Sequence, residues 1–452
     1  MTRGRLLVAI GIGVTVVLVL GLVAAIRLIP GGPDAAAAQG DDGQGGFDLR
    51  SGGVFLQSND ERGNEVVAFA RGEDGKLREA GRYKTGGVGS GSFQDSAQGI
   101  VLGSPNGEAS PQHHVDDAQL LFVPNAGSNT ISVFRLQENG LELAGQFPSG
   151  GETPVSLTVN HGLLYVLNNG EFDNRYILNF QEDEFLDNCT TGQKPSVTGF
   201  RIGGDGKLSQ IENSTQLLSE DATSGCVQVS FTPDGRKLIV TERAASVPDA
   251  EPGKGAIVTF SVNANGTLSG KQVLDPSGAG SFGFTITRNN HILVSENNRE
   301  AEDGSTLASY TMKADGTLEV NGAGSVPDNK TDACWVVSTT DGKLAFVANA
   351  FGGGTISSYG VDGDGVLTLL HSSATAASTQ DPEDDHLGDG TTDMSLSRDD
   401  RYLYQLNSIA GVLHVFKVNN GGTLSFVEDH QVFNLTPPDA GGHAAPFGLA
   451  AF

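Results

Sequence analysis

The sequence predicts an all-β fold, a seven-bladed β-propeller of four-stranded blades, because two series of motifs alternate along it and its carboxyl end supplies a closing strand. The first motif is a short β-rich run whose last residue is Asn or Glu. It occurs seven times, ending at Asn59, Asn125, Asn168, Glu242, Glu296, Asn349 and Asn407. The second motif is a Gly-containing turn before Leu, and its seven copies lie at residues 73–77, 138–143, 204–208, 264–268, 314–318, 363–367 and 420–424. The spacing of about 50 to 65 residues between copies is typical of propeller blades.

Residues 333–370 contain one complete blade, in which we expect strands at residues 336–338, 344–349, 355–361 and 366–370. The innermost strands of the other blades are predicted at residues 98–103, 155–159, 227–232, 282–287 and 394–397. Blade one has no inner strand before residue 52, whereas residues 446–452 resemble one. We therefore expect the carboxyl-terminal strand to complete blade one, which removes the exposed edges of the ring.

The amino-acid composition limits the kinds of partner that the protein can bind. The chain has 28 Lys and Arg against 54 Asp and Glu, which gives a formal charge of −26 at pH 7. Such a surface repels nucleic acid and anionic lipid headgroups, so we expect no nucleic-acid partner and contact with a membrane only through the amino-terminal segment. The charge is typical of a soluble, monomeric exported body, and the alternative interpretation is a cation-binding surface.

An apolar stretch at residues 6–26 follows Arg3 and Arg5 and is long enough to cross a bilayer. We interpret residues 1–29 as a signal anchor, or as a signal peptide cleaved near the small residues 35–38. Residues 30–51 then form a flexible linker, and residues 52–452 form the propeller. The expected location is outside the cytoplasm, either anchored to the membrane or secreted.

An oxidising location permits a disulfide among the three cysteines. Cys189 lies in a long loop of blade three and Cys226 precedes the inner strand of blade four, and the two blades are neighbours. We therefore predict a bridge from Cys189 to Cys226, with Cys334 buried beside Trp335.

The loops that enter each inner strand and those that join second to third strands share one face, and candidate catalytic residues lie there. Glu242 and Glu296 replace the Asn of other repeats, and a desolvated carboxylate at that place can act as a general base. Arg243 can stabilise an oxyanion or bind a carboxylate, and Arg299 is a second candidate for substrate binding. The alternative interpretation is a set of salt-bridged loop pairs.

Two histidines and two repeat asparagines complete the candidate site. His443 falls in a loop of the same face and can serve as acid or base, and His386 in another such loop is a candidate for binding substrate. Asn349 and Asn407 are also candidates for binding substrate.

The acidic run at residues 381–393 offers hard oxygen ligands for Ca²⁺, with Asp384, Asp385 and Asp389 as candidate metal ligands. Its spacing does not match an EF-hand loop, so a solvated loop is the alternative interpretation. We expect no other cofactor.

The repeats, including residues 231–242 (FTPDGRKLIVTE) and the NGTL turn at residues 265–268, resemble the lactonase-family propellers, which include 6-phosphogluconolactonase-like and carboxymuconate-cyclase-like proteins. The resemblance covers residues 52–452 and implies hydrolysis or isomerisation of a small lactone. Enzymes of this family have a histidine-rich segment before an inner strand, but residues 223–228 and 332–335 contain no histidine. Two hypotheses remain, an exported lactonase-like enzyme and a noncatalytic propeller that binds a protein, a glycan or a cation.

Overall fold

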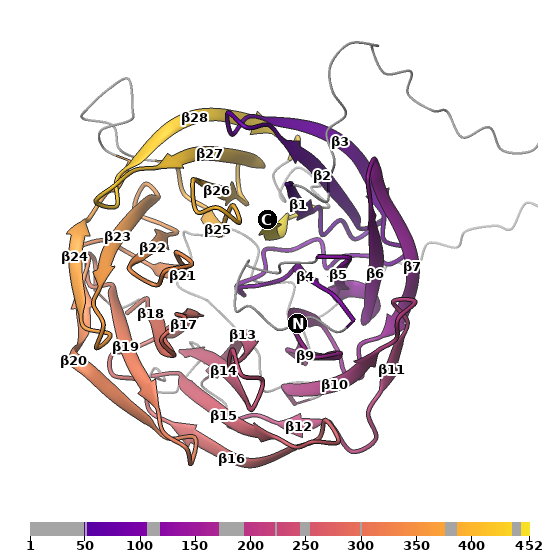
Figure 1. The fold of residues 1–452 in the computed structure, drawn as a ribbon, viewed down its shortest axis with the longest axis horizontal. Coiled ribbons are helices and arrows are strands. Elements are labelled where there is room, and N and C mark those ends of the chain that lie inside the picture. The colour runs from indigo at the N-terminus through magenta and orange to yellow at the C-terminus, as the bar shows by residue number, and fades with distance from the viewer. Residues whose placement is uncertain are drawn as a thin grey trace, which may run out of the picture. The chain divides into compact units, whose positions relative to one another are not determined.

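The computed structural model describes residues 49, 52–105, 118–170, 194–221, 224–244, 254–298, 301–375, 387–435 and 444–452. These residues lie in one compact unit, Gly46–Phe452. Within them the strands form seven antiparallel sheets, which are arranged as blades around an axis (Figure 1). The predicted all-β seven-bladed propeller is therefore confirmed.

Each blade is a sheet that runs from an inner strand at the axis to an outer strand at the rim, and in every blade but the first the strands follow chain order outward (Figure 1). Blade one consists of β29 (Phe447–Ala451), β1 (Gly53–Gln57), β2 (Glu65–Arg71) and β3 (Leu77–Lys84). Blade two consists of β4 (Val101–Gly103), β5 (Leu120–Asn125), β6 (Thr130–Gln137) and β7 (Gly140–Pro148), with the short η1 (Ala126–Ser128) after β5. Blade three consists of β8 (Pro154–Asn160), β9 (Leu163–Asn168), β10 (Ser196–Ile202), β11 (Leu208–Gln210) and β12 (Gln216–Leu217).

The remaining four blades follow in chain order. Blade four consists of β13 (Ser224–Phe231), β14 (Lys237–Ala244), β15 (Ala256–Val262) and β16 (Leu268–Leu274). Blade five consists of β17 (Ser281–Ile286), β18 (His291–Glu296), β19 (Thr306–Met312) and β20 (Leu318–Pro327). Blade six consists of β21 (Ala333–Ser338), β22 (Leu344–Asn349), β23 (Thr355–Val361) and β24 (Leu367–His371), and blade seven of β25 (Thr391–Leu396), β26 (Tyr402–Asn407), β27 (Val412–Val418) and β28 (Leu424–Gln431).

The carboxyl-terminal strand closes the ring, as the sequence predicts. Strand β29 pairs antiparallel with β1, with Phe55 opposite Ala450. The ring of Phe55 stacks on that of Phe452, with centroids 6.3 Å apart. The innermost strand of blade one therefore comes from the far end of the chain, so that no inner edge is left open between blades seven and two.

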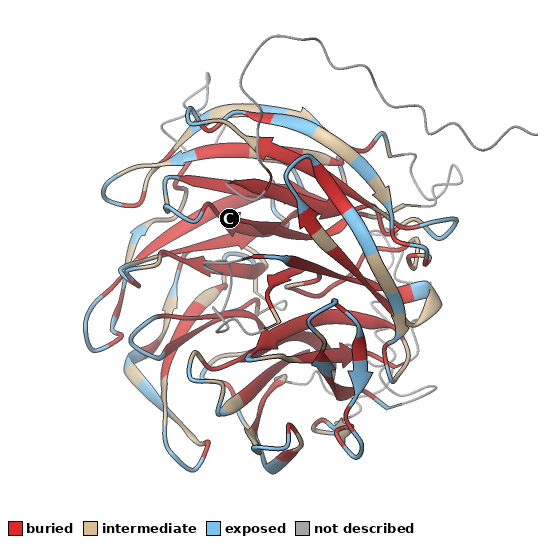
Figure 2. Cartoon of the chain, turned by 45° about the vertical axis from the view of Figure 1, so that its right-hand side comes forward, coloured by how far each residue is buried: buried red, intermediate tan, exposed pale blue. Residues whose placement is uncertain are grey.

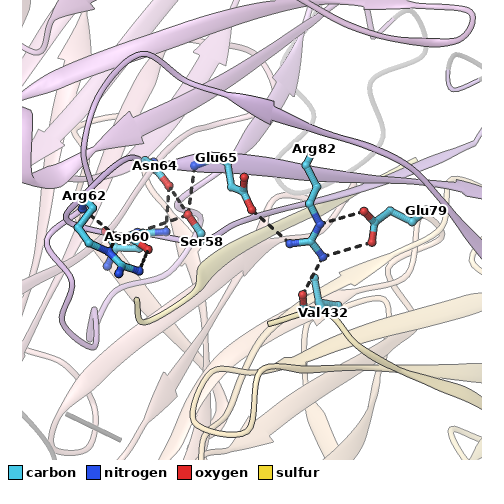
Figure 3. Close-up of polar contacts among 9 residues, drawn as sticks. Ser58, Asp60, Arg62, Asn64, Glu65, Glu79, Arg82 and Val432 are labelled. Atoms are coloured by element: carbon cyan, nitrogen blue, oxygen red, sulfur yellow. Dashed lines mark hydrogen bonds and ion pairs between the residues drawn. The ribbon is translucent and has the colours of Figure 1, made fainter. Parts of the chain in front are cut away.

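Arg82 joins the rims of blades one and seven (Figure 3). Its Nη2 donates to the backbone carbonyl of Val432 at 2.8 Å, while Nε and Nη1 contact Glu79 and Glu65 at 2.9 and 3.2 Å. Because Val432 directly follows β28, this side chain fixes the outer strand of the first blade to the last one. The two carboxylates hold the guanidinium in place.

Burial falls from the axis to the rim of each blade (Figure 2). Every residue of the inner strands β8 and β17 and of the second strands β5 and β18 is buried. The outer strands β3 and β7 carry many exposed residues. The apolar side chains of the inner strands therefore pack between neighbouring sheets, and this packing supplies most of the stability.

The bounds of several predicted strands differ from the structure by up to three residues, and two differences have a clear structural cause. The inner strand of blade two begins at Val101 and not at residue 98, because Gln98 has a φ of 61° and its side chain donates to the carbonyl of Leu157 at 2.8 Å. The fourth strand of blade three is divided into β11 and β12. Between them Ser214 Oγ accepts from the N–H of Gly199 at 3.1 Å, which replaces a ladder bond.

Among the described residues, no helix has the length and apolar character needed to cross a membrane. The apolar stretch at residues 6–26 lies outside the described residues, and so does the linker predicted at residues 30–51 apart from Leu49, which is buried.

Candidate functional site

A small cavity lies on the axis of the ring. Inner-strand residues of blades one to four, six and seven form its wall, together with residues 97–100 of the connection from β3 to β4. Its volume is about 50 Å³, which is enough for a few water molecules. The wall is mostly apolar, and its polar side chains are those of Gln98, Thr158, Gln228 and Asp393.

The connection from β3 to β4 crosses the axis and covers this cavity. We call residues 93–98 the plug. Its backbone is held at two points, where the Ala97 N–H donates to the Val227 carbonyl at 3.1 Å and the Ser96 carbonyl accepts from Trp335 Nε1 at 3.0 Å. Phe93 is buried in the same apolar cluster as Phe282, Trp335 and Phe346. The plug therefore contacts the inner strands of blades four and six, although it belongs to neither.

A glycine-rich stretch before the plug fits against the loop from β1 to β2, whose polar side chains appear in Figure 3. The N–H groups of Gly89 and Gly91 donate to the carbonyls of Asp60 and Asn59, at 2.8 and 2.9 Å. A Cβ on Gly89 would lie 2.1 Å from the backbone of Asn59, so no side chain fits there. These contacts fix the start of the plug, and the glycines at this place are required for close approach.

Asp393, in β25, is the ionisable residue in the wall of the cavity. Its side chain is buried, and its Oδ2 accepts from the Gly448 N–H at 2.7 Å. Burial raises the pKa of Asp393 to about 7, although backbone N–H groups of Gly448 and Gln98 favour the ionised form. A carboxyl group with this pKa can both accept and donate a proton near neutral pH.

Two glutamines connect the wall across the axis. Gln228 Nε2 donates to Gln98 Oε1 at 3.0 Å and to the Phe284 carbonyl at 2.7 Å, and Gln228 Oε1 accepts from the Phe284 N–H at 2.9 Å. Gln228 points inward where β13 has a bulge between Cys226 and Gln228. These bonds position both amides rigidly beside the cavity.

A buried ion pair fastens the plug to blade four. Arg243 Nε lies 2.8 Å from Asp95 Oδ2, and the two side chains are 3% and 6% exposed. Arg243 Nη1 also donates to the Cys226 carbonyl at 3.0 Å. The predicted cationic residue on this face is therefore placed beside the axis, where it contacts a carboxylate of the chain itself.

The repeat position occupied by Glu242 and Glu296 has a shared structural contact. In blades two, three and seven the Asn at this position bonds to the connection that enters its own blade: Asn125 to Thr85, Asn168 to Ser149 and Asn407 to Leu387. Glu242 and Glu296 do the same by accepting the N–H groups of Ser219 at 3.1 Å and Gly278 at 2.6 Å. Asn168 and Asn407 donate to a carbonyl of the connection, whereas Glu242 and Glu296 accept from its N–H groups, as Asn125 accepts from the Thr85 hydroxyl.

Glu296 is surrounded by donors of blade five. Its Oε2 accepts from Thr306 Oγ1 and Ser325 Oγ, both at 2.6 Å, and its Oε1 accepts from Tyr310 OH at 3.4 Å. Glu242 and Glu296 are buried, and neither lines the axial cavity. Their catalytic role stays a prediction, and the geometry gives both a structural contact instead.

The two predicted substrate-binding asparagines are also engaged within their blades. Asn349 Nδ2 donates to Ser357 Oγ at 2.8 Å, and Asn407 Oδ1 accepts from the Ala410 N–H at 2.8 Å. Neither lines the cavity. Arg299, His386 and His443 lie outside the described residues, so their predicted roles are unaffected.

The predicted metal site and disulfide fall partly outside the described residues, which include neither Asp384, Asp385 nor Cys189. Asp389 accepts from the Gly353 N–H at 2.9 Å. Within the described part of the chain, no group of three His, Cys, Asp or Glu side chains is placed to hold a metal ion. Cys226 and Cys334 are buried, as expected for Cys334, and the bridge from Cys189 to Cys226 stays a prediction.

The residues of the axial cavity were not selected from the sequence. The sequence places Asp393 at the end of the acidic run and does not distinguish it from the other acidic residues there. The sequence predicts that Gln98 lies in a strand, and Asp95 and Gln228 belong to no recognisable motif. The sequence offers one signal, because the connection at residues 85–100 is longer than the connections at residues 149–153 and 275–280.

The length of that connection is the usable signal. Residues 149–153 suffice to join β7 to β8, and residues 275–280 join β16 to β17, whereas residues 85–100 join β3 to β4. The additional residues are those that reach the axis. A long connection between two regular repeats therefore indicates a segment with its own place in the fold.

The fold and the axial cavity define a class of protein, a closed seven-bladed β-propeller whose channel is crossed by a plug from its own chain. No protein-family model matches the sequence, and the search of curated proteins gave no match. Solved structures match over nearly their full length. A Bacteroides uniformis protein named as a 6-phosphogluconolactonase is 14% identical with a TM-score of 0.60, and the match covers 89% of this chain and 99% of that one.

Two further structures give the same result. The periplasmic gluconolactonase of Pseudomonas aeruginosa is 15% identical with a TM-score of 0.59, over 88% of this chain and 98% of that one. A Lactobacillus plantarum protein is 13% identical with a TM-score of 0.59, over 89% and 99%. At these identities the likeness concerns the fold, and it confirms the predicted resemblance to lactonase-like propellers at that level.

Proposed function

We propose that this protein hydrolyses a small lactone at the axis of the propeller, with Asp393 as the general base. The observation that carries the proposal is a buried carboxyl group with a pKa raised to about 7 in the wall of the axial cavity. The fold supports it, because structures named as lactonases share this architecture.

The reaction requires one proton to move twice. The carboxylate of Asp393 accepts a proton from a water molecule while the water oxygen attacks the lactone carbonyl carbon. The ring C–O bond then breaks, and the leaving oxygen takes the proton from Asp393, which gives a hydroxycarboxylic acid that ionises. The amides of Gln98 and Gln228 border the cavity, and their N–H groups are bonded within the chain. The Gln228 amide becomes the candidate donor to the carbonyl oxygen when movement of the plug breaks its bond to Gln98.

A lactone ring needs more room than a cavity of about 50 Å³ offers, because that volume accommodates only a few waters. Hydrolysis at this site therefore requires the plug to move. The plug carries Ala97 and Gln98, which form part of the cavity wall, so its displacement would enlarge the space beside Asp393.

A panel of small lactones tests the proposal with the full-length protein and its Asp393→Asn variant. We expect the wild-type rate to rise with pH through about 7, as Asp393 ionises, and the variant to be slower by about 10²- to 10⁴-fold. A Glu242→Gln, Glu296→Gln double variant that still folds is the control, since neither residue lines the cavity. Equal turnover by wild type and Asp393→Asn would exclude the proposed base.

The second candidate is a noncatalytic propeller that binds a partner without chemistry. The observation in its favour is that the polar side chains around the axis already bond within the chain, as Gln228 does with Gln98 and Phe284. This candidate predicts no turnover of any lactone in the panel by the wild-type protein, together with saturable binding of a protein, a glycan or a cation.

We also propose that the propeller acts outside the cytoplasm. The support is the sequence, in which the apolar residues 6–26 follow two arginines and a body of formal charge −26 comes after them. Protease added to intact cells should digest the propeller if it is anchored outside. Protection in intact cells and digestion only after lysis would contradict this location.

A further inference from the structure

We infer that Arg243 is a carboxylate-binding site, which Asp95 of the plug occupies in the resting protein and which a small hydroxycarboxylate takes when the plug is displaced. The ligand class rests on the proposed function, because lactone hydrolysis releases a hydroxycarboxylate. The binding site itself rests on the ion pair and its surroundings. It adds a ligand subsite on blade four to the proton-transferring group on blade seven.

The contact between Arg243 and Asp95 has the chemistry of a guanidinium group that binds a carboxylate ligand. Arg243 Nε and Asp95 Oδ2 are 2.8 Å apart, with both side chains almost fully removed from solvent. A guanidinium group is the side chain best suited to hold a carboxylate, and the attraction is strongest where water is excluded. The carboxylate of Asp95 thus marks a place where a carboxylate of another molecule would be bound.

Blade four holds the guanidinium without help from the plug. Arg243 Nη1 donates to the Cys226 carbonyl at 3.0 Å, which belongs to the inner strand β13. The guanidinium lies against Gly225, where a Cβ would come within 2.6 Å of Nη1. The Cys226 N–H lies 3.4 Å from its acceptor, Asn169 Oδ1 on blade three. Because these contacts lie within the blades, the site stays formed when Asp95 leaves.

Asp95, in contrast, lies outside every strand of the propeller. It reaches Arg243 on the connection between β3 and β4, and it is followed within three residues by Ala97 and Gln98 in the cavity wall. Movement of this segment would therefore uncover the guanidinium and widen the cavity together. A ligand that competes with Asp95 for Arg243 would favour that open state by its difference in affinity for the two states.

Trp335 reports the position of the plug. It is the single tryptophan of the chain, it is buried, and its Nε1 donates to the Ser96 carbonyl at 3.0 Å. Displacement of the plug breaks this bond and exposes the indole to water. Its fluorescence emission should then shift to longer wavelength.

The experiment titrates the full-length protein with sodium D-gluconate at constant ionic strength, and it records both Trp335 emission and melting temperature. Wild type should show a saturable shift of emission to longer wavelength. Asp95→Ala, which removes the competing carboxylate, should reach half-saturation at a concentration at least about tenfold lower, with a gluconate-dependent rise in melting temperature. Arg243→Gln should show neither response.

Three controls separate this result from a general effect. Sorbitol has the hydroxyl groups without the carboxylate, and it should cause no shift. Arg201→Gln removes an arginine that donates to the Asn265 carbonyl in blade four, and this variant should respond as wild type does. The Asp95→Ala, Arg243→Gln double variant relieves the unpaired buried charge, so its failure to bind would be due to the lost site and not to unfolding.

The inference is overturned if Arg243→Gln responds as wild type does, or if Asp95→Ala binds gluconate no more tightly than wild type. Absence of any response in wild type and Asp95→Ala would also overturn it. These results are independent of turnover. A protein that binds gluconate through Arg243 but hydrolyses no lactone keeps this inference and loses the proposed function.

Discussion

Glu296 and Asp393 are both buried carboxyl groups, but their surroundings differ. Glu296 has four donors, namely Gly278, Thr306, Tyr310 and Ser325, and all of them belong to blade five or to the connection that enters it. Asp393 is contacted by Gly448 of the closing strand and by Gln98 of the plug, and it borders a cavity. The first carboxylate holds one repeat together, whereas the second joins segments that lie outside the repeats.

This difference distinguishes a structural acid from a candidate chemical one. A carboxylate whose oxygens are all engaged by nearby donors holds those donors in place. A carboxyl group beside a cavity, with fewer donors and a pKa near 7, can exchange a proton with a molecule in that cavity. The sequence shows that Glu296 replaces the Asn of other repeats, but the role of this residue is structural.

The largest expected effect comes from removing the closing strand on which Asp393 depends. A chain that ends at residue 443 lacks the buried side chains of Phe447, Leu449 and Phe452, whose burial contributes about 6 kcal/mol in total. Chemical denaturation should show a loss of at least this size. An unchanged unfolding curve would mean that blade one does not need β29.

Glu296→Ala should lower the free energy of unfolding by about 3 kcal/mol, because it leaves Thr306, Ser325 and the Gly278 N–H without their acceptor. Urea unfolding measures the loss. Glu319→Ala is the matched control in the same blade, since that side chain is 66% exposed and should change stability by less than about 0.5 kcal/mol. A loss of stability equal to that of the control would show that Glu296 has no structural role.

The stability should depend on pH through Asp393. Its pKa is raised from 3.8 to about 7, so the folded protein binds the proton more tightly than the unfolded chain does. The stabilisation that Asp393 contributes is therefore fully present below pH 4. It is lost as the pH rises to 7, which lowers the free energy of unfolding by up to about 4 kcal/mol. Burial also raises the pKa of Asp328 to about 6, which acts in the same direction.

The Asp393→Asn variant separates the contribution of Asp393 to the pH dependence of stability from the contributions of the other titratable groups. The difference in unfolding free energy between wild type and variant should change across pH 4 to 7, with the variant gaining relative to wild type as the pH rises. Thermal or urea unfolding at several pH values measures it. A difference that stays constant over this range would contradict the raised pKa.

Tyr310→Phe should have the smallest effect, about 1 kcal/mol. The Tyr310 hydroxyl accepts from the Ser277 N–H at 2.7 Å and donates to Glu296 at 3.4 Å, and the substitution removes both bonds. Lactone turnover and gluconate binding should stay at the wild-type level. A loss of either activity would show that the Glu296 network supports the axial site.

The sequence by itself determined the repeat. Strands need alternating apolar residues and turns need residues that tolerate their backbone angles, and both requirements are local, so residues 344–349 and 355–361 were predicted with the bounds of β22 and β23. The closing strand followed from the count of strands in each blade. The function of Glu242 and Glu296 did not follow, because the sequence does not indicate which donors a buried carboxylate meets.

Only the tertiary structure decided what lies at the axis. Asp393 is separated from Gln98 by most of the chain, and Arg243 is separated from Asp95 by two blades, so no local pattern connects either pair. The closure of the ring brings the inner strands together, and the plug then fills the space that they leave. Burial and the raised pKa of Asp393 arise from that arrangement, because they depend on exclusion of water by residues distant in the sequence.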